Sequence, residues 1–456
     1  MKKVAFHNLG CKVNSYELEY VQQKFKENDF RIVPFDQNAD VYVINTCTVT
    51  NIADRKSRQM LHRAKSLNPA AIVVAMGCYA QTNTEKALND ASIDIVIGNA
   101  EKGKAFDVIM NYLEDRNSER AAISDISTAK EYDEFTLQTT QEHTRVYVKI
   151  QDGCNQFCSY CAIPLARGRI RSRNIDDIVS EVSGLVKNGY KEIVLTGIHL
   201  SSYGMENYNQ EIETDIGLTN FENNTKLIDA IEAVAKIPGV ERLRLGSLEP
   251  RIITKDFLQR LSSLNNICPH FHLSLQSGSD SVLKRMNRRY TVNEFYEKAC
   301  LIREYFQHPG ITTDVIAGFP GETEEEFLET KEYLNRLDFY EAHIFKYSRR
   351  NGTVADKMTG QLTEKEKSSR SEALIKDGDI RSRRFREYYI GKNLDVLLEE
   401  PITINETEYM TGYTKEYVRI AVKADENLAN QIINGTAVRM LTDDILELEM
   451  AGNLEK

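Results

Sequence analysis

The chain has 456 residues, more than one ordinary core holds, so we predict two to four domains and expect three. Its net charge of −10 and isoelectric point near 5.5 exclude indiscriminate binding to nucleic acid, so any RNA contact must be a local basic patch. No apolar run approaches 18 residues, which excludes a membrane span and predicts a cytoplasmic protein.

Three apolar, strand-like segments in the first hundred residues each run into a cysteine. They span Val4–Cys11, Val41–Cys47 and Ala71–Cys78. Helical patterns lie between them, at about 15–28 and 53–66, and a fourth strand is expected near 93–97. The alternation predicts a parallel α/β domain over residues 1–120.

The three cysteines should converge, because ligands of such sheets bind beyond the carboxyl ends of the strands. Cysteine is also among the residue types most often buried in ordinary cores, and that is the competing interpretation of each. In a reducing cytoplasm, disulfides are not expected. The matched positions of Cys11, Cys47 and Cys78, two of them preceded by a glycine, favour a metal cluster.

Residues 103–144 are polar and acidic, which predicts a connecting segment, and six strand-like runs follow it. They lie at 146–150, 192–196, 243–246, 271–276, 312–316 and 342–346, and helical stretches separate nearly all of them. This repetition predicts a partial parallel (β/α)6 barrel in a domain of residues 140–370, with its active site at the strands' carboxyl ends. An acidic, Asn-rich insertion at 205–224 is interpreted as a surface excursion.

Cys154, Cys158 and Cys161 follow the first of these six strands. Three thiolates without a second Cys or His pair in the next hundred residues favour an iron–sulfur cluster with one iron left open. The competing interpretation is a structural metal knuckle, which normally has four ligands. Cys268 and Cys300 have no partner at ligand spacing and are interpreted as packing residues.

A charged helical stretch at 363–389 and several short alternating segments complete the chain. The segments predict a small antiparallel β-barrel in a domain of residues 385–452, with the size of an RNA-binding accessory domain. Residues 390–452 contain five Lys or Arg and twelve Asp or Glu, which argues against a broad electrostatic grip on RNA. Tyr413 or Tyr417 could stack on a splayed base, but most aromatics of this domain are expected in its core.

The spacing of Cys154, Cys158 and Cys161, with Tyr160 before the last, resembles the radical S-adenosylmethionine (SAM) superfamily. Across nearly the whole chain, the order of strand-end cysteines, barrel and small β-barrel resembles the methylthiotransferase family within it. The strings Asn45–Arg58, Gly153–Arg173 and Thr196–Gly204 are similar to the branch that modifies threonylcarbamoyladenosine in tRNA. This resemblance implies that C–H becomes C–S–CH3 at the 2-position of that base, next to the anticodon, and that the last domain is TRAM-like.

The resemblance also implies SAM and two 4Fe–4S clusters as cofactors. The catalytic cluster would be held by Cys154, Cys158 and Cys161, and an auxiliary cluster by Cys11, Cys47 and Cys78. SAM would be bound at successive strand ends, by Tyr160, Gly197, Glu249, Gln276, Ile316 and Gly318. An ordinary strand-end role is the alternative for each of these residues.

Eight arginines are candidates for binding RNA phosphate or, after the catalytic loop, the carboxylate of SAM, because guanidinium forks bind both. They are Arg55, Arg58, Arg167, Arg169, Arg171, Arg173, Arg383 and Arg384. Solvated loops or ion pairs with neighbouring acids are the alternative for any one of them. We expect a monomer that binds a tRNA anticodon loop and receives electrons from a low-potential donor.

Three other functions compete with this one. A methylthiotransferase could act on isopentenyladenosine in tRNA or on an aspartate of a ribosomal protein, and the strings named above disfavour both. A non-catalytic iron–sulfur protein that binds RNA and senses iron or oxygen is a more distant alternative, since it would not need six strand ends built for SAM.

Overall fold

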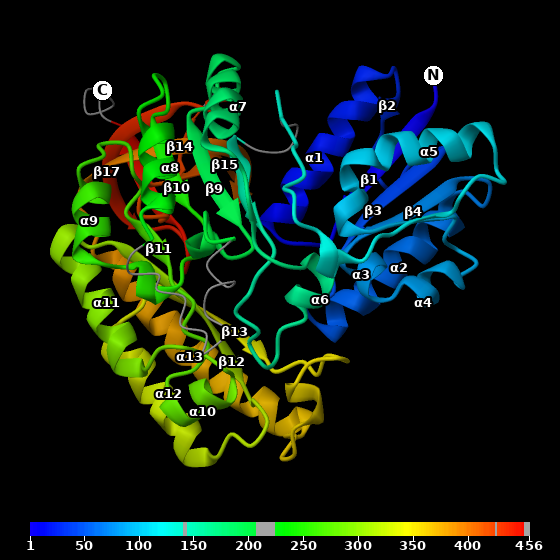
Figure 1. Ribbon diagram of the computed structural model, residues 1–456. Coiled ribbons are helices and arrows are strands. Elements are labelled where there is room, and N and C mark those ends of the chain that lie inside the picture. Colours follow the sequence, from blue (N-terminus) through cyan, green and yellow to red (C-terminus); the bar gives the residue numbers. More distant parts are fainter. Residues whose placement is uncertain (140–143, 207–223, 425, 451–456) are drawn as a thin grey trace.

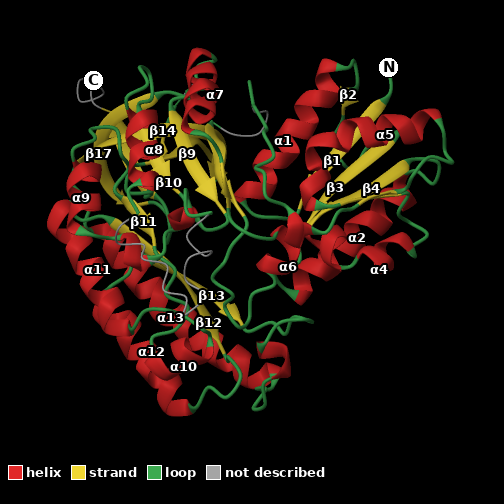
Figure 2. Cartoon of the chain, in the orientation of Figure 1, coloured by secondary structure: helices red, strands yellow, loops and turns green. Residues whose placement is uncertain are grey.

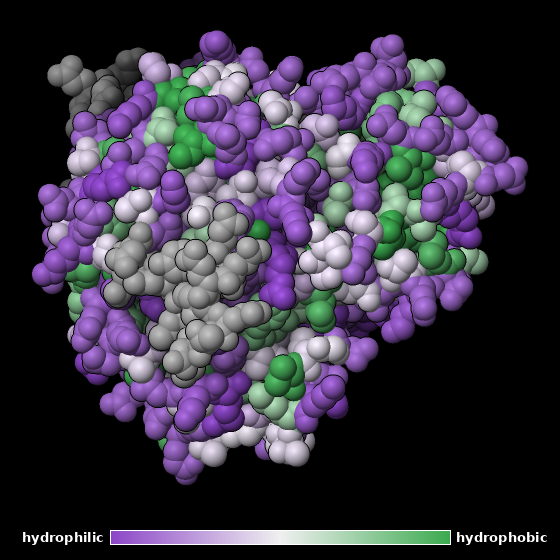
Figure 3. Space-filling model, viewed as in Figure 1, coloured by the Kyte–Doolittle hydropathy of each residue, from purple (hydrophilic) through white to green (hydrophobic). Residues whose placement is uncertain are grey.

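The computed structural model describes residues 1–139, 144–206, 224–424 and 426–450 (Figure 1). An α/β domain, an open curved barrel and a closed β-barrel follow one another along the chain, which confirms the predicted fold class (Figure 2). The insertion predicted at 205–224 lies almost entirely outside the described residues. Hydrophilic side chains predominate on the face in Figure 3, and apolar ones form small separate patches. Among the described helices, none has the length and apolar character needed to cross a membrane.

The first domain is a six-stranded parallel sheet with the order β2-β1-β3-β4-β5-β6. Its strands are β1 (Lys3–Asn8), β2 (Arg31–Ile32), β3 (Val41–Thr46), β4 (Ile72–Gly77), β5 (Ile95–Ile97) and β6 (Ala121–Ala122). All four predicted strands are present. The edge strands β2 and β6 have two residues each, too few for a sequence pattern to reveal.

Helices cover both faces of this sheet, so every residue of β3 and β4 is buried (Figure 1). On one face lie α1 (Lys12–Glu27) and α5 (Ala105–Glu114), and on the other α2 (Asn51–Leu67), α3 (Cys78–Thr82) and α4 (Thr84–Leu88). The prediction of a mere connecting segment at 103–144 is wrong at α5, because Ala105, Ile109 and Tyr112 pack on the sheet.

Six parallel strands of the second domain match the six predicted ones. They are β7 (Arg145–Asp152), β9 (Glu192–Gly197), β10 (Arg242–Leu245), β11 (His270–His272), β12 (Gly310–Ala317) and β13 (Glu341–Lys346). Short bridges join β10 to the β11 region, and β8 (Arg171–Ser172) adds an antiparallel edge to β7. The strands therefore form one open, curved wall.

The outer side of this wall carries α7 (Ile175–Lys187), α8 (Lys226–Ala235), α9 (Lys255–Ser262), α11 (Val292–Tyr305) and α12 (Glu324–Leu337) (Figure 1). Two short helices, α6 (Ile163–Arg167) and α10 (Asp280–Arg285), follow strand ends. The long α13 (Glu364–Glu387) begins with a capping box between Thr363 and Glu366 and confirms the charged helix predicted at 363–389.

The third domain is a closed barrel with the order β14-β15-β16-β18-β17. Its strands are β14 (Asn393–Ile404), β15 (Thr407–Tyr413), β16 (Arg419–Val422), β17 (Ile432–Met440) and β18 (Leu446–Met450). Four of the five pairings are antiparallel, as predicted, and β16 pairs with β18 in parallel.

The third domain contacts the amino-terminal ends of the second domain's strands. Arg242, the first residue of β10, donates to the carbonyl oxygens of Tyr413 (2.7 Å) and Asp395 (2.8 Å). At the start of β7, Arg145 forms an ion pair with Glu399 (2.6 Å). The carboxyl ends of the strands, where this fold places its chemistry, therefore face away from the third domain and toward the first.

Candidate active site

Cys11, Cys47 and Cys78 follow β1, β3 and β4 at one edge of the first sheet. Cys11 is the residue before α1, Cys47 follows Thr46 directly, and Cys78 begins α3. The chain order 2-1-3-4 reverses direction between β1 and β3, and such a switch point opens a crevice that binds ligands in parallel sheets. Cys11 and Cys47 flank that crevice, and Cys78 follows the next strand, β4.

The surroundings of these three thiols fit a metal centre. The side-chain amide of Asn99 donates to Sγ of Cys78 (3.5 Å), an outer contact of the kind that orients metal ligands. Burial, together with charge repulsion from the nearby Cys78 and Cys11, raises the pKa of Cys47 to about 11. Three sulfurs that repel one another as thiolates are stabilised together only by a cationic centre.

The second trio, Cys154, Cys158 and Cys161, lies on the loop after β7. Gly153 has a φ of +69°, and a Cβ there would lie 1.8 Å from the carbonyl oxygen of Arg169, so only glycine fits. The backbone amide of Cys154 donates to the carbonyl oxygen of Gly168 (3.1 Å), and the backbone amide of Cys161 donates to the carbonyl oxygen of Cys158 (3.0 Å). Burial, with repulsion from Cys158, raises the pKa of Cys161 to about 12 and also raises that of Cys154. This all-sulfur donor set fits an iron–sulfur cluster.

Sequence reasoning missed Arg288, which contacts the second trio. Its Nη1 donates a hydrogen bond to Sγ of Cys158 (3.3 Å). Its Nη2 donates to the carbonyl oxygen of Ser274 (3.1 Å), and its Nε donates to the hydroxyl oxygen of Tyr290 (2.9 Å). A guanidinium beside a thiolate lowers the energy of the charged sulfur. Because 130 residues separate Arg288 from Cys158, no local spacing could have revealed the contact.

Three of the residues predicted to bind SAM line one cavity of about 280 Å³, which we call the cradle cavity. Tyr160, Gln276 and Ile316 come from the cysteine loop and from the region of β11 and β12, and Val49 and Thr50, just after Cys47, form another part of the wall. The first domain therefore helps to enclose a pocket of the second. Asp314 also lines this cavity.

The other predicted SAM residues lie at the same strand ends without lining the cradle cavity. Glu249 is buried and forms an ion pair with Arg251 (2.7 Å). Gly318 has a φ of +74°, and its amide donates to the carboxylate of Glu322 (2.8 Å). Gly197 lines a second cavity, described next.

This second cavity, of about 470 Å³, lies inside the curved strand wall, and we call it the lumen cavity. Cys11, Lys12 and Val13 line one side, and its strand residues include Gly197, His270, His272, Thr312 and His343; Tyr417 of the third domain also lines it. The Lys12 side chain lines this cavity and is accessible to solvent. Loss of hydration, with repulsion from Arg145 and Arg244, lowers the pKa of Lys12 to about 8.

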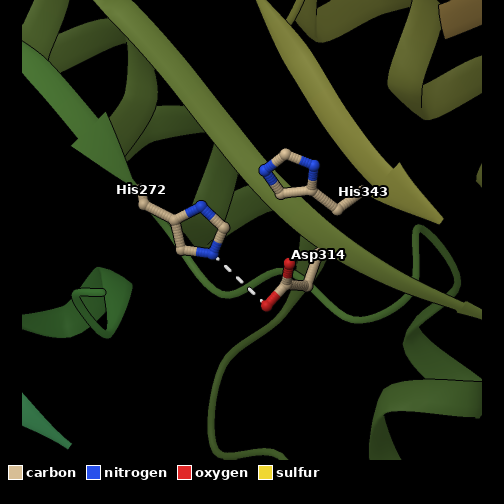
Figure 4. Close-up of side chains that lie close together, drawn as sticks. All are labelled: His272, Asp314 and His343. Atoms are coloured by element: carbon tan, nitrogen blue, oxygen red, sulfur yellow. Dashed lines mark ion pairs between the residues drawn. The ribbon is translucent and has the colours of Figure 1, made fainter. Parts of the chain in front are cut away.

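A cluster of His272, Asp314 and His343 joins the two cavities (Figure 4). One ligand atom from each lies within 4.8 Å of the others, and Nε2 of His272 is 3.3 Å from the Asp314 carboxylate. His272 and His343 line the lumen cavity and Asp314 lines the cradle cavity. The two cavities are therefore neighbours, and Cys11 opens into one while Tyr160 lines the other.

Three arginines of the run predicted to bind RNA or SAM are buried in ion pairs, which corrects that prediction for Arg167, Arg171 and Arg173. Arg167 pairs with Glu17 (2.8 Å) and Asp152 (3.0 Å), Arg171 lies 3.6 Å from Asp152, and Arg173 pairs with Glu181. These guanidiniums balance carboxylates where the first two domains meet, so they have no free fork to offer a ligand.

The other predicted arginines are exposed. Arg55 and Arg58 lie on α2 just after Cys47, and Arg169 covers the exposed ring of Phe157 (4.6 Å) on the catalytic loop. Arg383 pairs with Glu387 (2.9 Å) and Asp443 (3.1 Å), and Arg384 pairs with Asp338. The basic surface near the cysteines is therefore made by Arg55, Arg58 and Arg169.

The two tyrosines considered for base stacking are occupied within the protein. Tyr413 and Tyr417 stack on each other (4.6 Å between centroids), and Tyr417 also stacks on His270 (4.7 Å). Arg145 lies over both rings. They belong to the contact between the second and third domains, which favours the alternative that these aromatics pack within the protein.

Comparisons with known proteins cover both halves of the site. A model described as uncharacterized protein family UPF0004 matches residues 3–98, and a radical SAM superfamily model matches residues 148–334. The threonylcarbamoyladenosine tRNA methylthiotransferase MtaB of Bacillus subtilis is 39% identical over 98% of this chain and 99% of its own length. The protein of the same description from Aquifex aeolicus is 41% identical over 87% and 93%.

More distant relatives share the architecture. The tRNA-2-methylthio-N(6)-dimethylallyladenosine synthase of Finegoldia magna is 33% identical over 93% of this chain and 89% of its own. Among solved structures, the radical SAM methyltransferase TsrM from Kitasatospora setae has a TM-score of 0.53 at 14% identity, over 76% of this chain and 75% of that one. The latter likeness concerns the fold alone.

Proposed function

Because this chain belongs to the radical SAM methylthiotransferase family, we propose that it converts threonylcarbamoyladenosine in tRNA to the 2-methylthio derivative. It is a radical SAM enzyme, which uses SAM and a 4Fe–4S cluster. The observation that carries the proposal is the adjacency of the two cavities, since Cys11 lines one and the predicted SAM residues Tyr160, Gln276 and Ile316 line the other.

The residues present fit two clusters. Cys154, Cys158 and Cys161 would hold the catalytic cluster, and Cys11, Cys47 and Cys78 an auxiliary one. When bound, the clusters and SAM supply the radical chemistry and the methylated sulfur that replace an unactivated aromatic C–H bond by C–S. The chain's own task is to hold these groups and the base in one enclosed space.

Specific side chains suit that task. The Arg288 guanidinium donates a hydrogen bond to the Cys158 sulfur and so orients this proposed ligand. Tyr160 and Ile316 give the cradle cavity apolar walls that keep water from a reactive centre, and Gln276 offers a polar group to SAM. Val49 and Thr50, two and three residues after Cys47, connect the wall of this cavity to the proposed auxiliary trio.

The partner is tRNA, and we propose its anticodon loop as the bound part. Arg55, Arg58 and Arg169 are exposed near the two trios and can neutralise phosphates there, which agrees with a local patch on an acidic protein. The catalytic cluster also requires a low-potential electron donor, and we expect the chain to act as a monomer.

Nucleoside mass spectrometry of tRNA tests the function. We expect 2-methylthio-threonylcarbamoyladenosine in cells that carry the gene for this chain and only the unmethylthiolated base in cells that lack it. If the 2-methylthio derivative of isopentenyladenosine disappears instead, the proposed substrate is wrong and the activity class stands. If neither base changes, the enzyme does not act on tRNA.

A further inference from the structure

Resting on the proposed function, we propose that the lumen cavity binds the threonylcarbamoyl group of the substrate base, and that Lys12 and His343 bind its carboxylate. The cavity of about 470 Å³ has the size of a small-molecule site and is lined by Cys11, a ligand of the proposed auxiliary cluster. A base whose 2-position faces that cluster can extend its N6 substituent into this cavity.

Lys12 is a cation without a counter-ion. Within the described residues it has no ion pair and no hydrogen bond, and its ammonium lies 5.8 Å from the centroid of the Tyr147 ring. The same side of the cavity presents the first turn of α1, a 16-residue helix with no side-chain cap, whose free amides and dipole also favour an anion.

The carboxylates near the cavity are already paired. Glu341 lines it but forms an ion pair with Arg386 (2.7 Å), and Asp314 faces the cradle cavity and holds His272 (3.3 Å). Glu192, below the cavity, pairs with Arg244 (2.7 Å). Lys12 therefore lines the cavity as a cation, and no carboxylate of the described residues forms an ion pair with it.

His343 adds a donor to the same lining. Its ring stacks on that of His272 at 5.8 Å, and within the described chain no hydrogen bond to either of its ring nitrogens is found. His272, by contrast, forms a hydrogen bond with Thr312 (3.0 Å). It also pairs with Asp314 (Figure 4). The carboxylate of a threonyl group, with its two oxygens, matches a lining of one ammonium and one imidazole.

This lining also explains a preference among modified adenosines. The isopentenyl group carries no polar atom, so it would cover the Lys12 ammonium without giving it a partner. Sites built for a polar substituent reject analogues that lack it much more strongly than apolar pockets reject an added group. The lumen cavity therefore selects the threonylcarbamoyl base by its charge.

The test compares two synthetic anticodon stem–loops, one with threonylcarbamoyladenosine and one with its neutral methyl ester. For wild-type enzyme with both clusters, we expect kcat/KM for the acid to exceed that for the ester by about ten- to hundredfold, the size of one charge-assisted hydrogen bond. In Lys12→Met this ratio should fall close to one. Lys26→Met, at the exposed far end of the same helix, should keep the wild-type ratio.

His343→Leu provides a second variant whose position in the chain is far from every cysteine, in case Lys12→Met disturbs the cluster beside it. We expect it also to lower the acid-to-ester ratio, with iron content measured for each preparation. If both variants keep the wild-type ratio while wild type methylthiolates the acid, the carboxylate site is refuted and the proposed function stands. If wild type makes no 2-methylthio product from the acid stem–loop, both are refuted.

Discussion

Glu17→Gln should destabilise the chain by about 3–5 kcal/mol, the usual cost of leaving a buried charge without its partner. Glu17 lies on α1, six residues after Cys11, and is 1% exposed. Its carboxylate contacts Lys149 (2.8 Å), Arg167 (2.8 Å) and Lys102, and all three cations are buried as well.

The expected size follows from the charges that remain. Glu17 and Asp152 pair with four cations in the native protein, Lys102, Lys149, Arg167 and Arg171, and only Asp152 is left after the substitution. Lys149 (2.6 Å) and Arg167 (3.0 Å) keep their ion pairs with the Asp152 carboxylate. Lys102, which pairs with Glu17 in the native protein, then has no carboxylate partner among the described residues. Although burial raises it, the charges of Arg167, Lys102 and Lys149 hold the pKa of Glu17 well below its usual range.

Urea unfolding under anaerobic conditions measures the free energy of unfolding that Glu17→Gln loses. Glu27→Gln is the matched control. Glu27 ends the same helix and pairs with Lys24 (3.2 Å) at the exposed surface, so its loss should cost no more than about 0.5 kcal/mol. Because the Glu17 pKa is depressed, its contribution should be full above pH 4.5 and decline as the solution is acidified below it. Equal unfolding free energies for the two variants would refute the reasoning.

Other predictions concern the metal sites and one buried acid. Cys158→Ala should abolish 5′-deoxyadenosine formation, whereas Cys47→Ala should retain uncoupled SAM cleavage and lose thiomethyl product; each should lower iron content by about half. Cys268→Ala, a buried cysteine outside both trios, should keep all its iron, and loss of iron there would contradict the assignment. Arg288→Gln should make the catalytic cluster harder to reduce, because the guanidinium 3.3 Å from the Cys158 sulfur stabilises the more negative, reduced state. We expect the reduction potential to fall by on the order of 60 mV in an EPR-monitored titration. An unchanged potential would show that the contact carries no charge effect. Burial raises the pKa of Asp133 to about 6, so this side chain costs stability above pH 6 and the cost fades as pH drops toward 4. Asp133→Asn should therefore raise unfolding free energy by about 1–2 kcal/mol at pH 7.5 and by little at pH 5, and an equal gain at both pH values would disprove it.

The strand pattern of the first two domains could be predicted because buried parallel strands are continuous apolar runs with clear ends. Each of the four strands expected before residue 100 and all six of the barrel are present. Helix α5 was missed because its buried Ala105, Ile109 and Tyr112 sit within a stretch whose overall composition is polar and acidic. Composition averages over a helix, whereas burial depends on one face.

Side-chain roles were harder to predict than strands. The dense run from Arg167 to Arg173 suggests a ligand surface only while its acidic partners are unknown. Glu17 lies 150 residues from Arg167 and meets it through the packing of α1 against β7, which no local pattern reports. The same long-range packing brings Arg288 to Cys158 and His343 to Lys12's cavity, so the sequence could not indicate these groups either.

The buried charges also account for the relation between the two cysteine trios. Glu17 follows Cys11 by about two turns of helix, Asp152 precedes Cys154 by two residues, and Arg167 follows Cys161 by six. Arg167 bonds both carboxylates, so one guanidinium connects the peptide segments that carry the two trios. An apolar interface of the same volume could be as stable, but it would let the two domains slide against each other. Here, a shift of one helical turn would leave several buried charges unpaired, at a cost of several kcal/mol. We infer that the network fixes one separation between the two cysteine trios, which a reaction shared by the two proposed clusters would require.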